Sequence, residues 1–198
     1  MPQISEQKLR KIAFLAFNNS LRLHFDSILL FKNDSYSTAF HISVLATEET
    51  GKAFWIVDYL WNSEFGSGRT QKLDHKFLKL LYHHVEKQKA FLGRDYEPHS
   101  KEFREFVESG LLESKKQNSI YVGLPRKGQE IDLKGEIKTP KEISFEDAKR
   151  QIGKLNNHIY LLTEGVIGGY RTIDDEKIEA KLNNKLLIKL QDWEDSYG

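Results

Sequence analysis

The segment AFHISVLATEETGKAFWIVDYLW, residues Ala39 to Trp61, decides the fold class of this chain. Its apolar and small residues recur at every third or fourth position, which is the spacing of one face of an α-helix. A carboxylate, that of Glu49, falls on this stripe between Ala46 and Ala53. A buried ionised carboxylate is costly unless it is paired, so we expect Glu49 to have a partner, and Lys52 lies three residues further on.

Helical spacing continues on both sides of this segment. Residues Ser5 to Lys32 form a long amphipathic pattern with Ser5 as its N-cap, and the stretch KNDS ends it, so the first two helices should form a hairpin. A capping box, S-F-E-D, starts another helix at Ser144. The periodic pattern predicts the remaining helices over residues 71–92, 99–115, 144–164 and 174–193.

Between the helical patterns, residues 119–143 contain short β-like pieces, Ser119 to Leu124 and Glu130 to Leu133, punctuated by Gly and Pro. We therefore expect an all-α fold with three parts. An antiparallel helical bundle would cover residues 1–118, a small β-hairpin or extended arm residues 119–143, and C-terminal helices packed on the bundle residues 144–198.

The composition limits the classes of protein to which this chain can belong. At 198 residues, 39% hydrophobic and 30% charged, the chain has the size and balance of one globular domain with an elaboration. The formal net charge of +1 provides no global basic field, so any contact with nucleic acid must be local. The absence of cysteine excludes disulfides and thiolate metal sites. No leader pattern or apolar run of about 18 residues is present, so we expect a cytoplasmic protein that does not enter the membrane.

A second segment, GRTQKLDHKFLKLLYHH, carries residue types that could cleave RNA. Arg69 and His75 have five residues between them. An imidazole can take the proton of a ribose 2′-hydroxyl, and a guanidinium can stabilise the charge on the phosphate, with no metal. The basic and aromatic residues that would bind RNA or its phosphates are Lys76, Lys79 and Tyr82. The alternative interpretation is an ordinary solvated helix face.

Two further sets of residues in or near this segment contain histidine. Arg94 and His99 form an alternative catalytic pair with four residues between them, although Pro98 gives that pair a loop-like setting. His83 and His84 are adjacent, so they point about 100° apart on a helix and cannot chelate one ion as an i, i+4 pair could. We predict neither a metal nor another cofactor.

Three phrases, ISVLATEETGKAF, DHKFLKL and SIYVGL, resemble the AbiV branch of the HEPN proteins, over roughly Ala13 to Ile143. AbiV proteins show a small-residue helix ending in E-E-x-G-K, then a His-Lys motif that opens a helix, then a short strand with a tyrosine. The positions that match these three motifs in turn are Glu48, Glu49, Gly51 and Lys52, then His75, Lys76 and Lys79, then Tyr121 and Val122.

The resemblance implies an abortive-infection protein that defends bacteria against phage, built as an antiparallel helical bundle and usually a homodimer. It also implies a metal-independent ribonuclease with an Arg-x(4–6)-His motif near the dimer cleft, silent until infection, when a phage-encoded protein would activate it. Arg69 and His75 fit this spacing. An acidic or amide residue commonly follows the arginine in that motif; here Thr70 does, whereas Asp95 follows Arg94.

Two functions therefore follow as hypotheses. In the first, a dimer binds RNA in a shared cleft that carries the catalytic residues Arg69, His75, Glu49 and Lys52 of each subunit. His75 acts as general base or acid, Arg69 and Lys76 hold the phosphate, and Glu49 orients one of the cations. The products would carry a 2′,3′-cyclic phosphate and a 5′-hydroxyl. In the second, the dimer is a non-catalytic interaction module that captures a phage or host factor through its arm and C-terminal helices. The balanced charge slightly favours the second.

Overall fold

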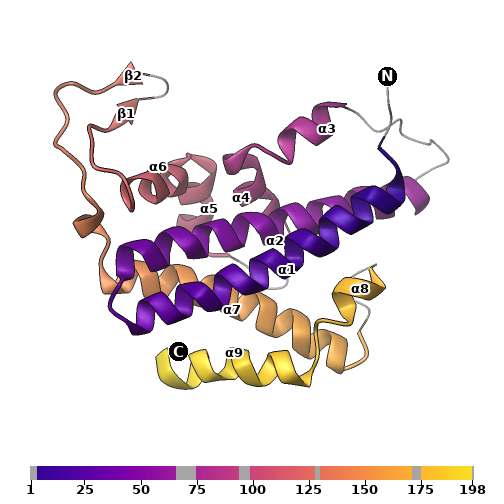
Figure 1. Cartoon of the computed structure of the whole chain (residues 1–198). Helices are drawn as coiled ribbons and strands as arrows, with labels where there is room; N and C mark the ends of the chain where they lie inside the picture. The colour runs from indigo at the N-terminus through magenta and orange to yellow at the C-terminus, as the bar shows by residue number, and fades with distance from the viewer. Residues whose placement is uncertain (1–3, 66–74, 94–98, 128–129, 171–174, 198) are drawn as a thin grey trace.

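The computed structural model describes residues 4–65, 75–93, 99–127, 130–170 and 175–197, and it confirms the all-α fold class (Figure 1). Within these residues most of the chain lies in helices that pack as an antiparallel bundle. The elements are α1 (Glu6–Lys32), α2 (Tyr36–Phe65), α3 (His75–Leu80), α4 (His84–Leu92), α5 (Lys101–Glu108), α6 (Leu111–Asn118), β1 (Arg126–Lys127), β2 (Glu130–Ile131), η1 (Pro140–Glu142), α7 (Phe145–Ile167), α8 (Glu176–Glu179) and α9 (Asn184–Tyr197).

The first two helices form the expected hairpin. Ser5 caps α1, because its hydroxyl oxygen accepts a hydrogen bond from the backbone N–H of Lys8 at 3.2 Å. The helix ends at Lys32 with Asn33 as its C-cap, and Asp34 follows with a φ of 59°, in the left-handed region that aspartate tolerates better than most residues. The backbone N–H of Ser35 then bonds to the carbonyl of Leu30 at 3.0 Å, which turns the chain into α2.

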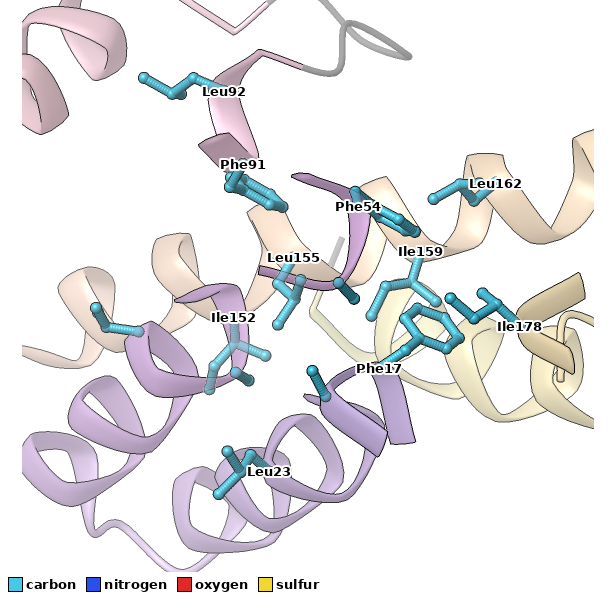
Figure 2. Packing of buried hydrophobic residues seen from close by; sticks show 14 of the residues in the cluster. Phe17, Leu23, Phe54, Phe91, Leu92, Ile152, Leu155, Ile159, Leu162 and Ile178 are labelled. Atoms are coloured by element: carbon cyan, nitrogen blue, oxygen red, sulfur yellow. The ribbon is translucent and has the colours of Figure 1, made fainter. Parts of the chain in front are cut away.

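Helix α2 is central to the bundle. It packs along α1, and it also contacts α4 and α6 on one side of the hairpin and α7 on the other (Figure 1). The core between these helices is built from aliphatic and aromatic side chains of α1, α2, α4 and α7, among them Phe17, Phe54, Phe91, Leu155 and Ile159 (Figure 2). Because other helices pack against α2 on several sides, its buried residues lie on more than one face of the helix.

Three helices predicted as continuous are broken. The pattern over residues 71–92 is divided at residues 81–83 into α3 and α4, and the pattern over 99–115 is divided at Ser109 and Gly110 into α5 and α6. Gly110 has a φ of 79°, which a helix cannot contain. The last pattern separates into α8 and α9, where the Asn183 side chain accepts from Lys185 N at 3.1 Å and caps the new helix.

The segment predicted as a β-like arm contains little regular strand. β1 and β2 pair antiparallel over two residues each, and Gly123 forms one isolated bridge with Lys138. The predicted strand from Ser119 to Leu124 is therefore wrong except for that bridge, whereas Glu130 and Ile131 do pair. Several large apolar side chains of this arm are exposed: Ile120, Tyr121, Val122, Leu124, Ile131, Leu133 and Ile137.

Helix α7 begins with the predicted capping box, in which Ser144 and Asp147 bond to each other's backbone N–H groups at 3.1 Å. It packs on α1 and α2, and α9 covers it from the other side. At the far end of α1, Phe31 contacts the rings of Phe145 at 4.9 Å and Trp193 at 5.2 Å between centroids, so both C-terminal helices join the core there. Among the described residues, no helix has the length and apolar character that a membrane crossing requires.

The buried His24 of α1 makes the fold sensitive to acid. Burial lowers its pKa from 6.5 to about 4, although a hydrogen bond to Asn156 partly raises it, so the folded protein keeps the ring neutral at pH values where the unfolded chain takes up a proton. Below pH 6.5 the free energy of unfolding should therefore fall, by about 3 kcal/mol in total by pH 4. Urea denaturation across this window measures it.

The matched control is His24→Gln, whose amide can still donate to Asn156 at the position of the 2.9 Å bond but does not titrate. This variant should be less stable near neutral pH and should lose less stability on acidification. An equal loss in both proteins would assign the acid sensitivity to another group.

Candidate active site

The most heavily bonded buried group in the described part of the chain is the carboxylate of Glu48, on α2. Its side chain is 1% exposed. One oxygen, Oε1, accepts from Lys116 Nζ at 2.8 Å and from Gln88 Nε2 at 2.9 Å. The other, Oε2, lies 2.7 Å from His84 Nδ1 and 3.1 Å from Lys87 Nζ. Four donors from α4 and α6 thus compensate for the loss of water around one charge.

A second carboxylate completes this group. Glu113 Oε2 accepts from Lys116 Nζ at 2.6 Å and from Gln88 Nε2 at 2.9 Å. We call the six side chains the Glu48 cluster: Glu48, His84, Lys87, Gln88, Glu113 and Lys116. Two carboxylates face two ammonium groups in it, so the ionised members balance in charge.

The helix backbones approach closely beside this cluster. A Cβ atom on Gly51 would overlap the carbonyl oxygen of Lys87 and lie 3.0 Å from Phe91 N. Only glycine therefore lets α4 lie directly against α2 at this point. Since Glu48 and Gly51 are three residues apart on one helix, the phrase EETGK provides both the contact surface for α4 and the carboxylate that binds its first turn.

The electrostatics favour an ionised Glu48. Burial alone would raise the pKa of this carboxyl, but the ion pair and hydrogen bond with Lys116, together with the bonds from His84 and Gln88, hold the pKa below its usual value. His41, at the edge of the cluster, lies 3.1 Å from the carbonyl oxygen of Lys116. Burial lowers the pKa of His41, and the charge of Lys116 lowers it further against the opposing effect of the backbone hydrogen bond.

Glu48, His84 and Glu113 offer ligand atoms within 4.8 Å of one another, which is the spacing of a metal site. Lys116 Nζ already lies in contact with all three, at 2.8 Å from Glu48, 3.3 Å from His84 and 2.6 Å from Glu113. An ammonium group of the chain itself therefore occupies the position that a cation would take. The donor set fits a lysine better than a resident metal ion.

The predicted partner of Glu49 is Lys52, and the structure contains this ion pair. Lys52 Nζ donates to Glu49 Oε1 at 2.6 Å, and the two side chains are 16% and 17% exposed. The fully buried carboxylate is Glu48, however, and not Glu49 as the stripe predicted. The correction follows from the burial of α2 on several sides, because α4 and α6 cover the face that carries Glu48.

Helix α3 carries the second predicted segment. Phe77 fixes it to α2 by stacking on Tyr59 with ring centroids 4.1 Å apart and by an edge contact with Trp55 at 5.5 Å. Three predicted RNA-binding residues are exposed around this anchor: Lys76, Lys79 and Tyr82. Arg69 lies outside the described residues, as does the side chain of His75, although its backbone begins α3.

The alternative pair is placed differently. Arg94 lies outside the described residues. The ring of His99 packs between aromatic rings, 5.4 Å from Phe91 and 5.5 Å from Phe103 between centroids, and its Nε2 atom is buried. The ring of His99 therefore contributes to the contact between α4 and α5.

Sequence reasoning did not select five members of the cluster: His84, Lys87, Gln88, Glu113 and Lys116. The three on α4 face Glu48 because the helix begins at His84, and Lys87 and Gln88 follow three and four residues later on the same face. One signal was available for Lys116. It lies four residues after Leu112, which is fully buried, so both share the inner face of α6.

The comparisons with known proteins agree with this architecture. The HEPN_AbiV family, described as AbiV, matches residues 8–161, from the start of α1 into α7. Searches of curated proteins and of solved structures gave no match. The matched range contains the α1–α2 hairpin, the EETGK phrase, every member of the Glu48 cluster and α3. The chain belongs to the AbiV family of abortive-infection proteins in the HEPN superfamily.

Proposed function

We propose that this protein defends bacteria against phage as a dimeric, metal-independent endoribonuclease that is silent until infection, when a phage-encoded protein activates it. Arg69 and Lys76 would bind the scissile phosphate, and His75 would act as general base or acid. The products would carry a 2′,3′-cyclic phosphate and a 5′-hydroxyl. Silence before infection is necessary because unrestrained cleavage of RNA would kill the host.

The observation that supports this proposal is the position of α3, which is packed on α2 through one aromatic residue and exposes basic side chains. The helix begins at His75 and is anchored through Phe77. Lys76 and Lys79 of α3, and Tyr82 just after it, lie at the surface. Cations bind phosphate, and an exposed tyrosine ring can stack on an unpaired base. Membership of the HEPN family, together with the spacing of Arg69 and His75, supports placing the reaction here.

Infected cells carrying His75→Ala or Arg69→Ala should lose phage protection and the RNA fragments with 5′-hydroxyl ends. Loss of a general base or a phosphate-binding cation lowers such rates by roughly 10² to 10⁴-fold. Fragment ends mapped after infection, with dimerisation and thermal stability checked on each purified protein, measure the effect. Lys101→Ala, which removes an exposed cation whose side chain is 85% accessible, is the matched control and should behave as wild type.

A second function is favoured by one observation, the exposed apolar side chains of the arm. Val122 is 69% exposed, Leu133 81% and Ile137 65%, and exposed apolar side chains of this kind are available to bind a protein partner. In this alternative the dimer captures a phage or host factor and cuts nothing. Full protection by His75→Ala together with loss of protection by Leu133→Asp would select it over the ribonuclease.

A further inference from the structure

His84 combines a buried anchor with an exposed ring. Its Nδ1 atom lies 2.7 Å from Glu48 Oε2, yet the side chain is 51% exposed while that of Glu48 is 1% exposed. The carboxylate is itself fixed by Lys116, Lys87 and Gln88, so its position is defined by three other donors. An imidazole with one nitrogen bound to a fixed carboxylate and about half of its side chain exposed is oriented for proton transfer.

The contacts also decide which nitrogen carries the proton. At 2.7 Å from a carboxylate oxygen, Nδ1 must donate, because two lone pairs at that distance would repel each other. Lys116 Nζ is further from Nδ1, at 3.3 Å, and its shorter bonds go to Glu48 and Glu113 at 2.8 and 2.6 Å. With the proton on Nδ1, the lone pair of the ring lies on Nε2, which is the atom able to accept a proton from a substrate.

We infer that Glu48 and His84 form a proton-transfer dyad that acts on single-stranded RNA, an inference that rests on the ribonuclease function proposed above. His84 Nε2 takes the proton of a ribose 2′-hydroxyl as its oxygen attacks the adjacent phosphorus. With the base role assigned to His84, His75 is the general acid of the proposed function. The bond between phosphorus and the 5′-oxygen breaks, that oxygen takes a proton from His75, and His75 recovers a proton from solvent. His84 then returns its proton to solvent. Glu48 holds the tautomer and orientation and keeps its own charge.

The surface beside His84 indicates the class of RNA. Tyr82, two residues before it in the α3–α4 junction, is 73% exposed, and Lys79 is exposed one turn earlier. A tyrosine ring stacks on a base only when that base is not already stacked within a duplex. The 2′-hydroxyl also reaches an in-line position for attack most easily in a flexible strand. Single-stranded RNA is therefore the substrate that this surface fits.

The test uses His84→Ala in the full chain, with His83→Ala as the matched control, since His83 is the adjacent exposed histidine and makes no side-chain cap bond to α4. Extracts of infected cells are given a labelled single-stranded RNA of mixed sequence or its duplex. His84→Ala should cut the single strand about 100-fold more slowly or worse, and His83→Ala as wild type does. Added imidazole should restore cleavage by His84→Ala, because the half-exposed site leaves room for it.

Each outcome separates the dyad from the wider proposal. Cleavage by His84→Ala at the wild-type rate overturns the dyad and leaves the ribonuclease proposal standing. Loss of cleavage that imidazole does not restore, in a variant with unchanged melting temperature, also overturns the dyad, because His84 would then act only through structure. Absence of cleavage by wild type under infection overturns the ribonuclease proposal itself, and the dyad with it.

Discussion

Gly51→Ala is expected to destabilise the protein by about 3 kcal/mol, the upper end of the cost of overpacking, because the new methyl group would overlap the backbone carbonyl oxygen of Lys87. That oxygen belongs to the backbone of α4, so a side-chain rotation cannot relieve the overlap. The whole of α4 must move away from α2, and His84, Lys87 and Gln88 would move away from Glu48 with it. Urea denaturation, analysed for both midpoint and slope, measures the loss.

Gly153→Ala is the matched control for this effect. Gly153 also lies inside a long helix, α7, but its Cβ would lie no closer than 3.7 Å to another group, the Trp193 Nε1 atom, which is ordinary contact. Alanine forms helix more readily than glycine, so this variant should be as stable as wild type or more stable by about 0.5 to 1 kcal/mol. Equal stability of Gly51→Ala and Gly153→Ala would contradict the close packing of α4 on α2.

The long helices were predictable because their signals are local. Ser5 and Ser144 cap helices where the sequence predicted, and the apolar spacing of the α1–α2 hairpin needs no distant partner. The break at Gly110 was also predictable in principle, because glycine disfavours a helix interior. The helical spacing of apolar residues on both sides of Gly110 nevertheless predicted one continuous helix. The break at residues 81–83 contains neither glycine nor proline, so only packing reveals it.

The site was predicted less well than the fold because its members are far apart in sequence. His84 lies 36 residues from Glu48 and Lys116 lies 68 residues from it, so no periodic pattern connects them. The pair Glu49 and Lys52 was found because three residues on a helix is a local spacing. Whether position 48 or 49 is the more buried depends on which helices cover α2, and this is a tertiary property.

Lys116→Met is expected to cost about 3 to 5 kcal/mol, although methionine keeps the length and apolar stem of the side chain. The lysine is 1% exposed, and its ammonium group bonds to both Glu48 and Glu113. Its removal leaves two carboxylates side by side with a net negative charge, and one of them cannot reach water. Chemical denaturation near neutral pH measures the effect.

The matched control is Lys115→Met, one residue earlier on the same helix. Lys115 pairs with Asp147 at 2.5 Å, but the two side chains are 31% and 24% exposed, so solvent screens the pair. We expect a loss of about 1 kcal/mol or less for this variant. If Lys116→Met and Lys115→Met lose the same small free energy of unfolding, then the burial of the Lys116 ion pairs does not make them contribute more to stability than an exposed pair.

The pH dependence of the Lys116→Met deficit has a defined sign. In wild type the pKa of Glu48 is lowered from 4.5, so its stabilising charge is fully present above pH 4.5 and is lost as the pH falls through the folded-state pKa. Without Lys116, burial and the neighbouring Glu113 favour the protonated form of Glu48. The difference in stability between wild type and Lys116→Met should therefore be largest near neutral pH and should shrink in acid.

A second substitution separates two contributions to this loss of stability: the lost attraction between Lys116 and the carboxylates, and the new repulsion between Glu48 and Glu113. In Lys116→Met/Glu113→Gln the repulsion between the two carboxylates is gone, while Glu48 keeps its bonds from His84, Lys87 and Gln88. The double variant should be more stable than Lys116→Met alone, with a coupling energy above about 1 kcal/mol in the double-mutant cycle. Additive losses would mean that Lys116 and Glu113 are not coupled, and Glu113 would then not belong to the network around Glu48.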